Sequence, residues 1–365
     1  MNGDGYSTIV DAILFLAMVS ACALILSPAI AGGGRERAAA DAGLRATASS
    51  CLASLSGGRV DYFEYRILGD RADEVAAQCG IDPGSWLYRD VTEAVLGRSC
   101  RHKPALEVTA EAAACQFTVR TGSRSITLNP LTAEYRSAVE GVIEEQMAER
   151  LDERYAYNFS LRWVPFAGVP FEGAVDCGKP CPSGAASAST MVTMPFRTSI
   201  SNSCIEEAIA PELGDIEALT LEYRRGVQGA AYRDRLREKL GSCLENSSRL
   251  MAGEVLGNTV YRVLPANDPG NPLGVLASFA DDYSVSAGPV LLDTGTDLDS
   301  LVAGMVVQYN QESLDSLADK IVEGVNDGTI GPGEERSVIV GWLGTRYNPS
   351  MARATLSVWV REDAA

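Results

Sequence analysis

Hydrophobic and polar residues follow clear patterns along this chain, beginning with an apolar run near its start. From Ile9 to Ala31 the sequence reads IVDAILFLAMVSACALILSPAIA, and Asp11 is its only charged residue. The stretch from Ala12 to Ile30 carries no charge and is long enough, as a helix, to cross roughly 30 Å of hydrocarbon. The pattern therefore predicts one transmembrane helix.

Beyond this run, alternation of apolar and polar residues predicts strands, and apolar residues three and four positions apart predict amphipathic helices. Strands are expected over 59–68, 155–166, 191–200, 276–285, 288–294, 335–344 and 352–362, with a hairpin over 117–128. Helices are expected over 36–55, 131–154 and 297–325, as two short helices within 70–98, and at several places within 204–256. Residues 167–189 are expected to form a loop, and the last two strands to pair across residues 347–350.

These elements predict an α+β fold class, in which an N-terminal transmembrane helix precedes a mixed extracytoplasmic domain with a largely antiparallel sheet. The expected divisions are a short lead over 1–8, the transmembrane helix over 9–31, a juxtamembrane helix over 32–57, a first half of the α+β domain over 58–200 and a second half over 201–365.

The charge balance narrows the range of partners. The 365 residues contain 48 acidic and 31 basic side chains, a formal net charge of -17. A field of this sign repels nucleic acid, so no nucleic-acid partner is expected. Membrane lipid, contacted through residues 9–31, is the expected apolar partner.

The fate and orientation of the apolar run have alternatives. The first ten residues lack the Lys or Arg of a secretory signal, yet the small residues before Gly32-Gly33-Gly34 resemble a cleavage site. Arg35, Arg37 and Arg45 follow the run, and the positive-inside rule would place them in the cytoplasm. Long domains can override that rule, and two further features favour an exterior location.

The first feature is cysteine usage. Eight of the nine cysteines lie outside the apolar run, and an even number fits four disulfides in an oxidising space. They are Cys51, Cys79, Cys100, Cys115, Cys177, Cys181, Cys204 and Cys243. Buried free thiols are the alternative. A zinc site is disfavoured because the chain has no CxxC pair and a single histidine, His102.

The second feature is a pair of N-glycosylation sequons. Asn158-Phe-Ser and Asn246-Ser-Ser both fit the acceptor pattern, which is used in extracytoplasmic proteins. Together with the cysteines, they favour a single-pass membrane protein whose large domain lies outside the cytoplasm.

Sequence motifs give no catalytic residues, cofactor-binding residues or committed metal ligands. Residues 173–180 have the spacing of a phosphate-binding loop, but Pro180 stands where that loop needs Ser or Thr. The triplet 293–295 resembles that of an aspartic protease, yet it occurs only once. A loose Ca²⁺ site among the nearby aspartates is an alternative, and an EF-hand is excluded. We therefore expect no enzyme activity and no cofactor.

The start of the chain carries a family resemblance. GYSTIVDAILFLAMVSACALIL resembles archaeal type IV pilin-like proteins, most closely uncharacterised single-span proteins encoded with archaeal pilus and secretion machinery. YNFSLRWVPFAGVPFEG is similar to a strand-and-loop motif of that group. The resemblance implies cleavage after Gly5, and it makes Asp11 the acidic residue that helps subunits assemble. Asp4 stands where such proteins usually carry Lys or Arg.

The expected function is that of a non-enzymatic, membrane-anchored cell-surface protein, a minor or accessory component of an archaeal type IV pilus-like system. Its expected protein partners are pilin-like subunits or pilus assembly proteins. The main alternative is an anchored extracellular ligand-binding or sensor domain unrelated to pili, and an anchored hydrolase is a third.

Overall fold

The computed structural model covers most of the region beyond the predicted anchor. It describes Phe15 and Met18 and residues 38–66, 69–121, 124–127, 133–195, 198–226, 231–256 and 298–361. Gly5, Asp11 and nearly all of the predicted transmembrane segment lie outside these residues, as do the strands expected over 276–285 and 288–294. Among the described residues, no helix combines the length and the apolar character that crossing a membrane requires.

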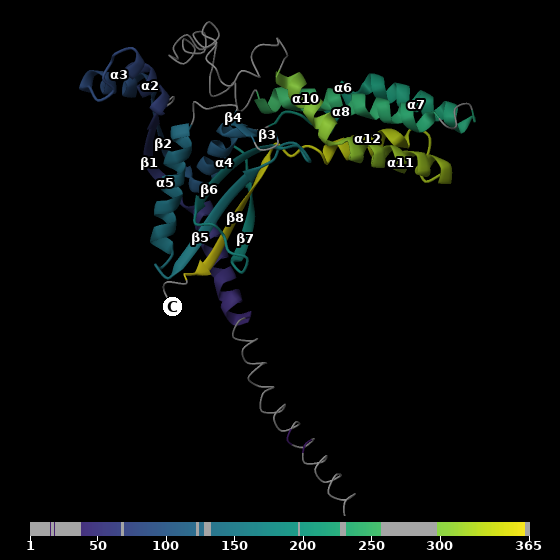
Figure 1. Cartoon of the computed structure of the whole chain (residues 1–365). Coiled ribbons are helices and arrows are strands. Elements are labelled where there is room, and N and C mark those ends of the chain that lie inside the picture. Colours follow the sequence, from purple (N-terminus) through teal and green to yellow (C-terminus); the bar gives the residue numbers. More distant parts are fainter. Residues whose placement is uncertain are drawn as a thin grey trace, which may run out of the picture.

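Six antiparallel strands form the main sheet, in the order β4-β3-β6-β5-β8-β7. They are β3 Phe117–Thr121, β4 Arg124–Thr127, β5 Tyr155–Trp163, β6 Phe171–Gly178, β7 Ala186–Thr193 and β8 Met351–Val360. Although β8 comes from the C-terminal end of the chain, it lies between β5 and β7 (Figure 1). The predicted α+β class with an antiparallel sheet is confirmed for the described residues.

Helices cover one face of this sheet. They are residues 38–57, α4 Ala105–Cys115 and α5 Ala133–Arg150. Successive strand residues point to opposite faces, and Phe159, Leu161 and Trp163 of β5 are fully buried on the helix side. On the neighbouring strand, a Cβ at Gly173 would lie 2.1 Å from the carbonyl oxygen of Ala113 in α4. Glycine is therefore required here for the close approach of α4 to the sheet.

A second, two-stranded antiparallel sheet extends from the main body. It consists of β1 Arg59–Arg66 and β2 Gly97–Pro104, which are connected by α2 Gly69–Gln78 and α3 Trp86–Leu96. Ser85 caps α3, because its hydroxyl accepts a hydrogen bond from the amide of Tyr88. Residues 69–96, here called the tip, lie at the far end of this ribbon (Figure 1).

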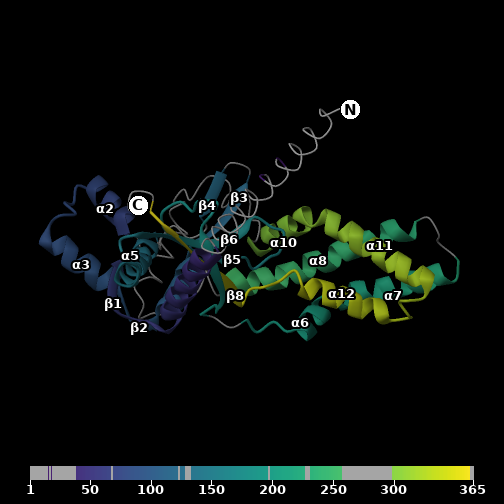
Figure 2. The same cartoon turned by 90° about the horizontal axis from the view of Figure 1, so that it is seen from below.

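The remaining helices form a bundle beside the main sheet. They are α6 Asn202–Ala208, α7 Ala210–Arg224, α8 Tyr232–Leu256, α10 Leu298–Tyr309, α11 Gln311–Asp327 and α12 Glu334–Gly344. Tyr223 and Tyr232 stack with ring centroids 4.1 Å apart, and Arg237 of α8 pairs with Asp315 of α11. Figures 1 and 2 show the bundle and the tip on opposite sides of the sheet.

Tyr347 connects the bundle to the sheet. Its hydroxyl lies 2.7 Å from the Ser247 hydroxyl and 3.1 Å from that of Ser248, both in α8. Its ring meets Phe166, just after β5, edge-on at 6.2 Å. Burial raises the pKa of the Tyr347 phenol. This side chain therefore bridges the two parts of the described chain directly before β8 enters the sheet.

Most local predictions hold, but several are wrong. The strand expected over 191–200 extends only to Thr193, the last residue of β7. Residues 167–189 are not one loop, since they contain β6 and the start of β7. Residues 335–344 form a helix rather than a strand, because Glu335, Ile339 and Leu343 are buried together on one helical face. The predicted terminal hairpin is consequently not formed, and β8 pairs with β5 and β7 instead. The helix expected over 297–325 is divided at Asn310 into α10 and α11.

Candidate interaction surfaces

The second face of the main sheet points away from α4 and α5. We call it the open face, and it is formed by the strand residues that alternate with the buried ones. Its members include Asn158, Ser160, Arg162, Glu172, Asp176, Ser187, Ser189, Met191, Arg353, Thr355 and Ser357. Nearly all of these side chains are polar, so this face suits solvent or a hydrogen-bonding partner.

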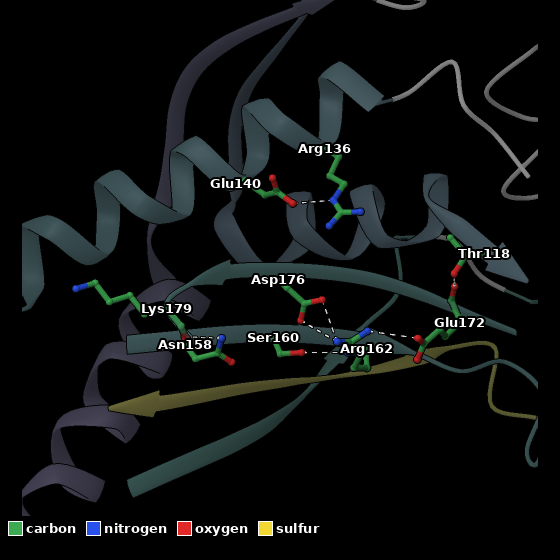
Figure 3. A network of polar contacts seen from close by, with 9 residues as sticks. All are labelled: Thr118, Arg136, Glu140, Asn158, Ser160, Arg162, Glu172, Asp176 and Lys179. Carbon is green, nitrogen blue, oxygen red and sulfur yellow. Dashed lines mark hydrogen bonds and ion pairs between the residues drawn. The ribbon is translucent and has the colours of Figure 1, made fainter. Parts of the chain in front are cut away.

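Arg162 is the centre of a charged network on the open face (Figure 3). Its guanidinium lies 2.9 Å from both carboxylate oxygens of Asp176 and 3.4 Å from Glu172, both on neighbouring β6. It also donates to the Ser160 hydroxyl at 3.1 Å. Since two carboxylates already satisfy Arg162, we interpret this network as holding β5 against β6, with the modest stabilisation typical of exposed ion pairs.

The β7 and β8 strands carry a ladder of hydroxyl groups on the same face. The Ser187 and Ser357 hydroxyls lie 2.8 Å apart, and those of Ser189 and Thr355 lie 3.0 Å apart. β7 is an edge strand, and its sequence ASASTMVT contains neither a charge nor a proline. Edge strands usually carry such residues as protection against further pairing. The β7 edge is therefore a candidate interaction surface.

The tip presents a different chemistry, because large apolar side chains are exposed on it. Trp86 is 75% exposed and Leu87 is 59% exposed, and Val75, Ile81 and Val91 are also exposed. Isolated exposed apolar residues are common, but a group within two short helices is typical of a contact surface. The apolar sequence contexts of Trp86 and Trp163 predict a core position for both. Trp163 is fully buried, but the prediction is wrong for Trp86.

Charge is unevenly distributed between the tip and its ribbon. Residues 59–104 contain eight acidic and seven basic side chains, although the whole chain has a net charge of -17. Arg66 pairs there with Asp73 at 3.4 Å and with Glu134 of α5 at 3.6 Å. Most of the basic side chains belong to the two strands, whereas the tip itself contains six acidic and two basic side chains. Tryptophan is enriched at the centres of protein–protein contacts, so the exposed Trp86 remains the feature that favours a contact surface here.

The cysteines do not form the predicted disulfides within the described structure. Seven of them are thiols: Cys51, Cys79, Cys115, Cys177, Cys181, Cys204 and Cys243, while the side chain of Cys100 is outside the description. Three of the buried thiols have different charged neighbours. Cys177 lies near Glu140 and Glu144 of α5, Cys243 near Glu212 of α7, and Cys51 near Arg150.

The pKa values of these thiols differ, which predicts different reactivities. Burial raises the pKa of Cys115, Cys177 and Cys243 to about 12, whereas hydrogen bonding to Ser201 lowers the pKa of Cys204. Because the thiolate is the reactive form, we expect Cys204 to react with a maleimide at pH 7 in the native protein and the three buried thiols to react only after unfolding. Peptide mass spectrometry after timed labelling measures this order.

A Ser201→Ala variant provides the control for that prediction. Loss of the hydroxyl that lies 3.2 Å from the Cys204 sulfur should raise the thiol pKa and slow labelling at pH 7. Fast native labelling of Cys177 or Cys243 would contradict the packing described above.

The two sequon asparagines are engaged in the fold. Asn158 lies in β5 and donates to the carbonyl of Lys179 at 3.0 Å. Asn246 lies within α8 and donates to Glu212 at 2.9 Å, and Ser248 of its sequon is fully buried. His102 is exposed on β2, with a positive φ of 55°. Among the described residues, no group of three or more His, Cys, Asp or Glu could hold a metal ion.

Sequence reasoning missed the exposed residues of the tip. The apolar residues of the tip helices have ordinary helical spacing. That spacing predicts a buried helix face but does not identify the surface that covers it. The available signal was the shortness of both helices and the Asp82-Pro83-Gly84 turn between them. Two short helices on a two-stranded ribbon cannot bury five large apolar side chains, because the ribbon provides too little core.

The described chain is thus an α+β protein with a projecting, partly apolar tip and a helical bundle. Residues 10–232 match the sequence profile of a group described as "Family of unknown function (DUF7284)", and this stretch is more than half of the chain. The protein belongs to that family. The match includes the tip and five of the six main strands, and it ends at the start of α8. No curated protein and no solved structure matches the chain.

Proposed function

We propose that this protein is a non-enzymatic, membrane-anchored assembly component whose tip docks onto another protein of a cell-surface machine. The expected machine is an archaeal type IV pilus-like system, with a pilin-like subunit or an assembly protein as the partner. The observation that carries the proposal is the exposed apolar group around Trp86 and Leu87 on the tip.

The position of the tip supports this role. The helix of residues 38–57 leaves the sheet at the end opposite the tip, and its N-terminal end extends away from the sheet (Figure 1). If residues 9–31 are the anchor, the tip faces away from the membrane, where it can meet another protein rather than lipid. The large domain would then stand in the extracytoplasmic space, and Asp11 would act within the anchor.

In-cell photo-crosslinking tests the docking role. A photoreactive residue at position 86 or 87 is expected to crosslink to a pilin-like or pilus assembly protein, identified by mass spectrometry. The same residue at Tyr309 or Val360, which are also exposed and apolar but lie away from the tip, is the matched control. Equal crosslinking from all four positions, or none from the tip, would reject the tip as the docking surface.

A second measurement tests the anchor. Mass spectrometry of the native N-terminus should find Tyr6 as the first residue if the peptidase implied by the resemblance cuts after Gly5. An intact Met1 would leave a simple anchor without pilin processing. A start near Gly32 would mean that the domain is released, which contradicts the proposal.

A substitution at Trp86 tests whether this side chain contributes to docking or to folding stability. Because Trp86 is 75% exposed, Trp86→Ser is expected to change the free energy of unfolding by no more than about 0.5 kcal/mol while reducing the crosslink from position 87. Thermal unfolding followed by circular dichroism measures the first quantity. A large loss of stability would assign Trp86 to the folding core instead of a docking surface.

A further inference from the structure

A groove runs between α11 and α12, on the part of the bundle beyond the family match. It has a volume of about 870 Å³, which is within the range of small-molecule sites. Ser313 and Ser316 of α11 line it, together with Ser337 and Gly341 of α12. These small side chains leave space between the two helices where larger ones would fill it.

Two cations also line this groove, Lys320 and Arg346. Within the described part of the chain, neither forms an ion pair with a carboxylate. Five other bundle cations are paired with carboxylates: Arg233 with Asp319, Arg237 with Asp315, Lys239 with Asp215, Arg249 with Glu245, and Arg336 with Glu206. In so acidic a protein, two cations without a carboxylate partner on one concave surface are a local site for negative charge.

Arg346 is held in a defined position for such a role. Its guanidinium carbon lies 4.7 Å from the centroid of the Trp342 ring, which lines the same groove. Stacking on an aromatic face orients the guanidinium plane and leaves its N–H groups free to bind an oxyanion. The Nε atom of Arg346 is buried and has no hydrogen-bond partner in the described structure.

Among the described residues that line the groove, Glu312 is the only acidic one. It precedes Lys320 by two turns of α11, roughly 12 Å along the helix axis. Glu312 therefore opposes an anion without neutralising Lys320 directly. Substitutions can therefore test the site in both directions, because removing Glu312 should strengthen anion binding and removing either cation should weaken it.

We propose that the α11–α12 groove binds a small molecule with phosphate or carboxylate groups. Arg346 and Lys320 contact the oxyanions, and the hydroxyls of Ser313, Ser316, Ser337 and Thr345 are available as neutral hydrogen-bond partners. Such a site would give the protein a ligand-sensing role in addition to docking, and it does not depend on the tip or on pilin processing.

Isothermal titration of the full chain in a non-ionic detergent, at low ionic strength, tests this site. The probes are inorganic phosphate and citrate, which separate phosphate from carboxylate recognition, with glycerol as a neutral control. One of the two anions is expected to bind saturably, and the affinity should fall as salt screens the charges. Absence of saturable binding by both anions would overturn the proposal.

Five variants define the site. Lys320→Gln and Arg346→Gln should each weaken binding about tenfold, since each removes a charged hydrogen-bond donor. Glu312→Gln should strengthen binding. Arg249→Gln, which removes a paired cation elsewhere on the bundle, should leave it unchanged. Arg346→Lys keeps the charge and checks that the loss is not a folding defect. An equal loss in the Arg249 variant would show nonspecific attraction and reject the site.

Discussion

Replacing Gly173 with alanine is expected to lower the free energy of unfolding by about 3 kcal/mol, among the largest effects of any single methyl group in this chain. The new Cβ would lie 2.1 Å from the carbonyl oxygen of Ala113 and 3.2 Å from the Trp163 ring. A backbone carbonyl cannot rotate away from the clash, so α4 must move off the sheet. Thermal or urea unfolding of the variant measures the loss.

Gly141→Ala is the matched control for this substitution. Gly141 lies at an exposed position within α5, and a Cβ added there would meet no neighbouring atom within 4 Å. Alanine there should raise the free energy of unfolding by roughly 0.5–1 kcal/mol, because glycine loses more conformational entropy in a helix. If both variants behave alike, the close contact between α4 and β6 is not present in solution.

Tyr347→Ala should cost about 3–5 kcal/mol of unfolding free energy, as do other truncations of large buried aromatic side chains. It removes the edge-on contact with Phe166 and leaves the hydroxyls of Ser247 and Ser248 without their shared partner. Since Tyr347 connects the bundle to the sheet, we also expect the single unfolding transition to broaden or divide. Calorimetry measures both effects.

Two further variants separate the contributions of Tyr347. Tyr347→Phe retains the ring and should cost only about 1–2 kcal/mol, the usual range for a buried hydrogen-bonding group that loses its partner. Tyr309→Ala removes a tyrosine that is 46% exposed and should change stability by about 0.5 kcal/mol or less. A Tyr347→Ala protein as stable as the Tyr309 variant would show that the two parts fold independently.

The elements that the sequence predicted correctly share one property: their secondary structure is determined by their own residues. Val139, Ile143 and Met147 specify the buried face of α5 through spacing alone. The two tip helices and the turn between them follow from Asp82-Pro83-Gly84. Where the sequence prediction was wrong, contacts with residues far away in the sequence determined the secondary structure. The β-branched run in residues 335–344 became α12 because the bundle offers a surface for one helical face.

The candidate sites depended on distant contacts even more strongly. Lys320 and Arg346 are 26 positions apart, and only the tertiary arrangement of the bundle places them in one groove. Trp86 resembled a core residue in the sequence, although it is exposed in the structure. Sequence spacing predicts that a helix has an apolar face, but it does not predict which surface packs against that face. Likewise, an even cysteine count suggested disulfides, whereas seven cysteines are thiols in the described structure, four of them buried.

The order of amino acids alone was enough for the α+β class, the strong acidity, the helical or extended character of most segments, and the apolar run that predicts an anchor. Those properties are local or additive along the chain. Three-dimensional packing was needed to place β8 between β5 and β7, to leave the tip uncovered, and to bring two cations into one groove. Each of these requires contacts between residues far apart in sequence, and those contacts are set by which apolar surfaces bury each other.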